Sequence, residues 1–84
     1  MNGLKYYRGK IDDIDKKIVK LLTSRLNLVR GISKFKKANK IKVVDKKRES
    51  QVIGNIKKLS NKKHQKFVID VYKKIINYSE RLQK

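Results

Sequence analysis

The chain has 84 residues, of which 25 are Lys or Arg and 7 are Asp or Glu, so its formal net charge is +18. It has no Cys and one His, which excludes a disulfide framework, thiolate chemistry and a His/Cys zinc site. We expect a single domain over residues 1–84, with a core so small that association with a second chain is favoured. No apolar run reaches the roughly 20 residues of a membrane span, and the N-terminus lacks a signal peptide's apolar region, so we expect a cytoplasmic protein.

The excess of positive charge predicts an anionic partner, which could be a nucleic acid, a lipid surface or a small polyanion. Most of the cations are lysines spread along the whole chain. An ordinary solvated surface has the same pattern. Charge alone therefore leaves the class of partner open.

The first predicted element is one long helix over residues 4–38. Its apolar residues recur at intervals of three and four, as on a single helix face: Leu4, Tyr7, Ile11, Ile14, Ile18, Leu21, Leu28, Ile32 and Phe35. Such a helix is roughly 50 Å long, whereas a compact chain of this length has a radius of gyration near ~12 Å. Because two shorter helices cannot cover that rod, we expect an intertwined homodimer.

Two shorter helices are predicted after an aperiodic connection of residues 39–44. Asp45 is placed to cap the second helix, which extends to Leu59. Ser60 and Asn61 are expected to end that helix and to cap the third, whose apolar stripe runs over residues 67–82. Since no segment alternates with strand period, the predicted fold class is all-α.

Arg25 interrupts the apolar face of the first helix. A guanidinium at an apolar position is costly unless it meets an anion. Lys36 lies about 20° around and some 16 Å further along the same face, so the two side chains could hold a small anion between them. Arg8 is roughly 25 Å from Arg25 along the axis and could join them only from a partner chain in an antiparallel dimer. The simpler alternatives are an Arg25 that extends to solvent or pairs with an acid, and an Arg8 that is ordinary surface.

Two further groups each share a helix face. Asp45, Arg48 and Glu49 have the i, i+3, i+4 spacing, which by itself indicates only a local ion pair near a cap. Ser79 and Gln83 are four residues apart, beside the apolar stripe of the third helix. Neither group alone predicts a function.

In order along the chain, these residues resemble the all-helical, AroQ-class chorismate mutases. The matching segments are Arg8-Gly-Lys-Ile-Asp-Asp-Ile-Asp15, Leu21-Leu-Thr-Ser-Arg25, Lys36, Asp45-Lys-Lys-Arg48-Glu49, and Ser79 with Gln83. The resemblance implies three-helix protomers in an intertwined homodimer that converts chorismate to prephenate for phenylalanine and tyrosine biosynthesis. It implies no metal and no cofactor, since the reaction is an intramolecular Claisen rearrangement.

The resemblance also implies a role for each residue. Arg25 and Arg8 from the neighbouring chain hold the substrate carboxylates, with Ser79 assisting and Arg48 adding positive potential. Lys36 and Gln83 are the catalytic donors to the ether oxygen, and Lys36 also reaches a carboxylate. Asp45, chiefly through its backbone, and Glu49 engage the ring hydroxyl.

Three alternatives remain at this point. An isochorismate pyruvate-lyase would use a similar fold and a related dianion, and the identity of the product distinguishes it. A basic helical nucleic-acid-binding module would bind DNA in a salt-dependent way without turning over chorismate. A purely structural coiled-coil dimer predicts that Arg25→Leu stabilises the protein with no loss of function.

Overall fold

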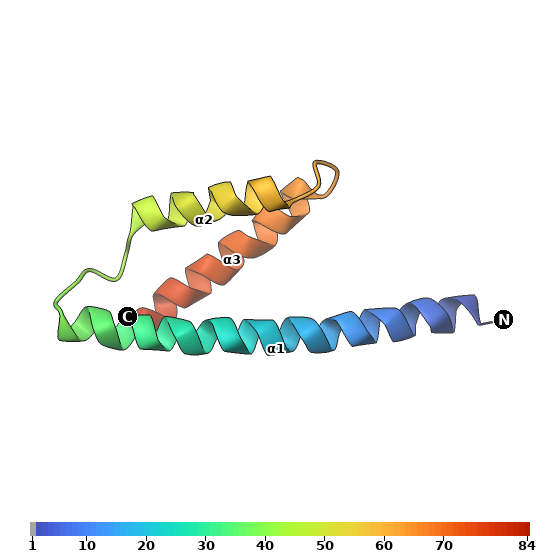
Figure 1. Cartoon of the computed structure of the whole chain (residues 1–84), viewed down its shortest axis with the longest axis horizontal. Coiled ribbons are helices and arrows are strands. Elements are labelled where there is room, and N and C mark those ends of the chain that lie inside the picture. The colour runs from blue at the N-terminus through green and yellow to red at the C-terminus, as the bar shows by residue number, and fades with distance from the viewer. Residues whose placement is uncertain (1) are drawn as a thin grey trace.

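The computed structural model describes residues 2–84, and within them it contains three helices and no strand (Figure 1). The helices are α1 (Gly3–Ala38), α2 (Lys46–Leu59) and α3 (Gln65–Gln83). The predicted all-α class is therefore confirmed. The first and second helices also have the predicted bounds to within a residue.

Helix α1 is a continuous rod of 36 residues. No proline interrupts it. Its last turn carries Lys36 and Lys37, whose positive charges interact favourably with the negative end of the helix dipole. The chain extends over 59 × 25 × 16 Å with a radius of gyration of 16.3 Å, against the ~12 Å of a compact chain of this length. The shape of the whole protein is thus set by one helix that is too long for its own domain.

Asp45 caps α2 as the sequence predicts. Its backbone is extended, and its Oδ1 accepts a hydrogen bond of 3.0 Å from the backbone N–H of Arg48. Ser60 ends the helix in an extended conformation, again as expected. An Asp at this position satisfies one of the free N–H groups of the first turn, which fixes where the helix begins.

The predicted cap of α3 at Asn61 is wrong. The Asn61 side chain accepts a hydrogen bond of 2.9 Å from the Lys63 N–H, and its carbonyl accepts one of 2.9 Å from His64. These bonds close a separate turn before the helix, because an Asn side chain reaches the backbone two residues ahead as readily as it caps a helix. Helix α3 begins only at Gln65, after His64.

Helix α3 joins the other two. It packs along α2 and its C-terminal half crosses α1, whereas within residues 2–84 helices α1 and α2 do not contact each other (Figure 1). The few buried side chains lie at these junctions: Val29 and Ser33 on α1, and Ile76, Ser79 and Gln83 on α3. A core of this size is small even for a short chain.

The N-terminal half of α1 projects away from the other helices (Figure 1). Leu4, Ile11 and Ile14 on its apolar face are each more than half exposed. The accessible surface of the chain is 7652 Å² at a mass of 9.9 kDa, whereas a compact monomer of that mass exposes about 5200 Å². The predicted excess of apolar surface is therefore confirmed. Among the described helices, none combines the length and the apolar character needed to cross a membrane.

Candidate active site

A pocket of ≈ 370 Å³ lies between α1 and α2, with α3 along one side. It exists because α1 and α2 are held apart by α3 and by the connection of residues 39–45. We call it the central pocket. Its apolar lining is Leu28, Val29, Ile32, Val43, Val52 and Ile76, and its polar lining is Arg25, Lys36, Asp45, Arg48, Glu49, Ser79, Glu80 and Gln83. Seven of the eight predicted site residues are therefore brought together in one chain.

Arg25 lies at the junction of α1 and α3. Its Nη1 donates a hydrogen bond of 2.9 Å to the Ser79 hydroxyl, which in turn donates one of 2.8 Å to the backbone carbonyl of Ile75. Among residues 2–84 no acid forms an ion pair with Arg25, so the alternative of a pairing acid is wrong. The guanidinium is thus oriented by a neutral partner and keeps its full charge for a ligand.

Lys36 fixes the connection between α1 and α2. Its Nζ donates a hydrogen bond of 2.8 Å to the carbonyl of Val43, which brings that connection over the C-terminal end of α1. An ammonium group has three donors. The remaining N–H groups of Lys36 are therefore available to acceptors in the central pocket.

The start of α2 brings three charged side chains to the pocket. Asp45 holds the cap, Arg48 follows in the first turn, and Glu49 lies one residue further on. The local ion pair at this end joins Lys46 Nζ to Glu49 Oε2 at 3.5 Å, rather than any two of the three predicted residues. Because the Lys46 side chain is 83% exposed, this pair contributes little stability.

Gln83 is buried although it is the last residue of α3. Its Nε2 donates a long hydrogen bond of 3.3 Å to the carbonyl of Ser79, while its Oε1 is shielded from solvent and accepts none. The second N–H of the amide is free to donate to a group in the pocket. A buried amide with unused hydrogen-bonding capacity is a feature of a binding site rather than of a core.

Arg8 is the one predicted residue that lies elsewhere. It is exposed on the N-terminal half of α1, in a shallow hollow lined also by Leu4, Lys5 and Asp12. Its separation from Arg25 is the one expected along a straight helix, so it cannot reach the central pocket of its own chain.

Glu80 lines the central pocket and was missed by the sequence analysis. The hydrogen bond that a protonated Glu80 can donate to the Glu49 side chain raises the pKa of Glu80 above its ordinary 4.5, and partial burial and the charge of Glu49 add to the shift. A signal was present in the sequence. Glu80 follows Ile76 by four residues and precedes Gln83 by three, which places it on the inner face of α3.

Comparison with known proteins identifies the family of this chain. The profile of the family described as chorismate mutase type II matches residues 7–84. The chain belongs to this family. The chorismate mutase resemblance of the sequence is thereby confirmed, and with it the predicted enzyme class, an isomerase that forms prephenate in aromatic amino acid biosynthesis.

Two chorismate mutase relatives illustrate how the domain occurs. The chain is 32% identical over 79 residues to the "Chorismate mutase" of Methanocaldococcus jannaschii, which covers 92% of this chain and 80% of that protein. It is 36% identical over 85 residues to the "Bifunctional chorismate mutase/prephenate dehydratase" of Buchnera aphidicola, which covers 99% of this chain but 22% of that protein. No solved structure matches the chain significantly.

Proposed function

We propose that the central pocket binds chorismate and accelerates its rearrangement to prephenate, in a homodimer whose partner chain supplies Arg8 to each pocket. The observation that carries this proposal is the convergence of seven residues from three helices on one pocket, each of the type that the family resemblance assigns to substrate. We further expect the protein to act in the cytoplasm.

Substrate binding selects the reactive conformer. The enolpyruvyl side chain of chorismate must lie over the ring before a C–C bond can form, and most conformers in water do not meet this condition. Arg25 and the partner's Arg8 hold the two carboxylates in the compact arrangement, with Ser79 orienting Arg25 through the 2.9 Å hydrogen bond. Arg48 adds positive potential at the opposite wall.

Lys36 and Gln83 act on the bond that breaks. As the C–O bond of the ether lengthens, partial negative charge develops on the ether oxygen, and fixed donors then bind it more strongly than in the ground state. Lys36 has N–H groups left after its bond to Val43, and Gln83 has one left after its bond to Ser79. Asp45 and Glu49 fix the other end of the ring through its hydroxyl.

The accessible surface area supports the proposed dimer, as the site composition does. The chain exposes 7652 Å², about 2400 Å² more than the roughly 5200 Å² of a compact monomer of its mass. A standard interface buries about 800 Å² per partner. The exposed apolar face of α1 therefore offers enough surface for a large obligate interface, and the isolated pocket lacks its Arg8.

The first test is the consumption of chorismate with the product identified. The parent is expected to form prephenate, whereas Arg25→Ala should lower kcat/KM by about 30- to 1000-fold, since a buried charge contact contributes about 2–4 kcal/mol. Arg30→Ala removes an exposed guanidinium of the same helix and serves as the matched control. No turnover by a folded parent dimer would overturn the proposal.

An isochorismate pyruvate-lyase is distinguished by the same experiment. Incubation with isochorismate in place of chorismate would release pyruvate and salicylate if the chain were a lyase. Absence of turnover with either substrate, together with salt-dependent DNA binding, would favour the nucleic-acid alternative.

A further inference from the structure

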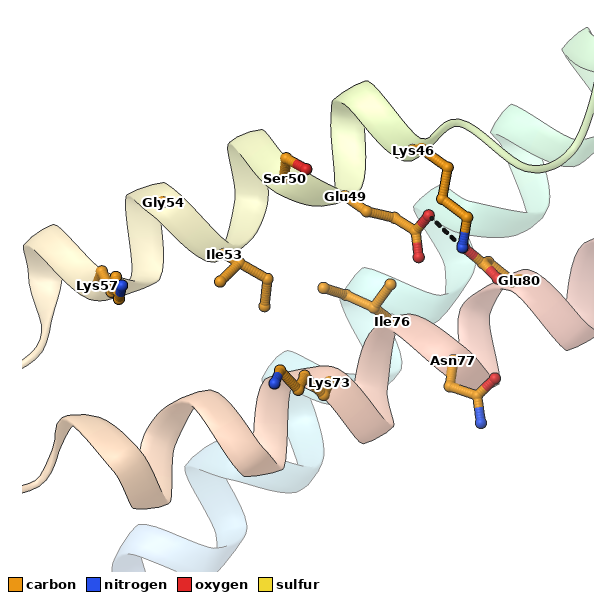
Figure 2. Close-up of a pocket in the computed structure, with 10 residues that line it drawn as sticks. All are labelled: Lys46, Glu49, Ser50, Ile53, Gly54, Lys57, Lys73, Ile76, Asn77 and Glu80. Carbon is orange, nitrogen blue, oxygen red and sulfur yellow. Dashed lines mark ion pairs between the residues drawn. The ribbon is translucent and has the colours of Figure 1, made fainter.

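Glu49 and Glu80 form a wall between two hollows. Besides the central pocket, a second hollow of ≈ 650 Å³ lies on the other side of the junction of α2 and α3, lined also by Lys46, Lys57, Lys73 and Asn77 (Figure 2). We call it the outer hollow. Glu49, Ile76 and Glu80 are the residues that line both. Any change in this wall therefore changes the central pocket.

The two carboxyl groups of the wall come from α2 and α3 and lie at the same helix junction, where Figure 2 draws the Lys46 ammonium between them. Glu49 Oε2 and Glu80 Oε1 are both shielded from solvent, and neither accepts a hydrogen bond from a protein donor. Lys46 approaches Glu49 only to 3.5 Å from an exposed position. Two carboxylate oxygens cannot bond each other without a proton, so one bound proton satisfies both atoms at once.

The charge balance of the central pocket makes this proton matter. The cations of its lining are Arg25, Lys36 and Arg48, and the carboxyl groups are Asp45, Glu49 and Glu80. With all three acids ionised, the three positive and three negative charges of the lining sum to zero, so the lining of one chain does not attract a dianion. A single proton on the wall leaves the lining of that chain positive.

We propose that Glu80 is a positioning residue for Glu49, in which a proton shared between the two carboxyl groups fixes the Glu49 carboxylate in the wall of the central pocket and removes a negative charge that opposes the dianionic substrate. The inference rests on the proposed function. Glu80 acts through Glu49 and touches no reacting atom.

The charged groups around Glu80 set the direction of the pH dependence. Glu49 and Lys46 of α2 and Lys84, which follows α3, are the charged groups that act on Glu80. Asp45, Arg48, Arg25 and Lys36 line the same central pocket. The hydrogen bond to Glu49 raises the pKa of Glu80 and the charges of Lys46 and Lys84 oppose the shift. As the pH falls through this raised pKa, the wall takes up its proton and kcat/KM rises, chiefly through a lower KM.

Glu80→Gln and Glu80→Ala separate positioning from a merely structural role. The Gln amide donates to Glu49 at every pH. Glu80→Gln should therefore lose the pH-dependent change in kcat/KM, and its kcat/KM at neutral pH should match or exceed that of the parent. Glu80→Ala removes the donor and should lower kcat/KM below that of Glu80→Gln. Asn77→Ala, on the outer hollow but not on the central pocket, should keep the profile of the parent.

The measurement is kcat and KM for chorismate as a function of pH, from the ordinary Glu value of 4.5 upward to neutral pH. The proposal is overturned if kcat/KM of Glu80→Gln depends on pH in the same way as that of the parent. It is also overturned by a full effect of Glu80→Gln in a Glu49→Gln background, where no carboxylate remains to be positioned.

A second readout is independent of activity. Titration of the side-chain carboxyl ¹³C signals of the free protein should show Glu80 above its ordinary range, and Glu80→Gln should remove that signal. An ordinary titration of Glu80 in an active enzyme overturns the positioning proposal alone. A raised pKa of Glu80 in a folded dimer that is inactive at every pH overturns the proposed function, and with it the proposed effect of Glu80 on substrate binding.

Discussion

Arg25 Nη1 donates a hydrogen bond of 2.9 Å to the hydroxyl of Ser79, 54 positions away in the sequence. This bond joins the middle of α1 to the C-terminal half of α3 at the edge of the central pocket. The Ser79 hydroxyl is itself oriented by donating to the carbonyl of Ile75. The guanidinium is therefore held in place before any ligand arrives, which lowers the entropy lost on binding.

Ser79→Ala should weaken substrate binding moderately. The lost hydrogen bond contributes about 1 kcal/mol, so KM is expected to rise about fivefold, with kcat changed less. Steady-state kinetics measure this. Ser24→Ala is the matched control, because the Ser24 hydroxyl makes the same bond to the carbonyl four residues back on an exposed face. Equal kinetic changes in the two variants would contradict the role of Ser79.

Lys36→Ala should lower kcat. Removal of a donor to a developing oxyanion costs about 2.7–4 kcal/mol, or roughly 10²–10³ in kcat. Lys37→Ala removes a neighbouring exposed ammonium and should leave kcat near that of the parent. Because Lys36 also bonds Val43, circular dichroism must show that the variant keeps its helices. A folded Lys36→Ala dimer with the parent's kcat refutes this role.

Gln83→Glu should make kcat depend on pH, with the highest values in acid. The ionised carboxylate repels the ether oxygen, and only the protonated acid can donate to it, so kcat is expected to drop about 100-fold or more near neutral pH and to recover as the pH falls. Gln51→Glu adds the same charge at an exposed position of α2 and should follow the parent. Superimposable pH profiles of Gln83→Glu and the parent would remove Gln83 from the site.

Mixing two inactive variants tests whether Arg8 comes from the partner chain. Arg8→Ala and Arg25→Ala homodimers should each lose most activity. A mixed dimer has one pocket with both arginines intact and one with neither, so random exchange of subunits should restore about a quarter of the parent's activity. Activity that stays at the level of the two homodimers after verified exchange contradicts the assignment of Arg8 in trans.

Ile14→Asp should dissociate the dimer. Ile14 is 53% exposed on the apolar face of α1, and each dimer would bury two unpaired carboxylates at a cost of several kcal/mol. The molecular mass measured by sedimentation should fall from twice 9.9 kDa to that of one chain, and turnover of chorismate should be lost. Asn27→Asp adds a charge on the opposite face of α1 and should sediment as the parent does. A dimeric Ile14→Asp variant places the interface elsewhere.

Stability should fall as the pH rises through the raised pKa of Glu80. The folded chain holds this proton more tightly than the unfolded chain, whose Glu titrates near 4.5. The stabilisation is therefore complete in acid and is lost as the pH rises above that value through the folded-state pKa. Thermal unfolding of the parent and of Glu80→Gln at several pH values should show this slope only in the parent.

The sequence by itself determined the three helices and the cap of α2. The intervals of three and four along residues 4–35 predict α1 because they repeat with the helical period. Asp45 caps α2 because the bond to the Arg48 N–H spans only three residues. The site residues could be named only because an ordered set of residue types matched a family, since no periodicity distinguishes Arg48 from other surface cations.

Only the tertiary structure decided which faces meet. Periodicity marks an apolar stripe on α1, but it does not tell that Val29 and Ser33 are the residues buried there, or that Glu80 turns a carboxyl to Glu49. It also did not distinguish an Asn61 turn from an Asn61 cap, since both use the same side chain over two or three residues. The bond between Arg25 and Ser79 depends on how α3 crosses α1. That crossing is set by the packing of whole helices, which no local pattern in the chain records.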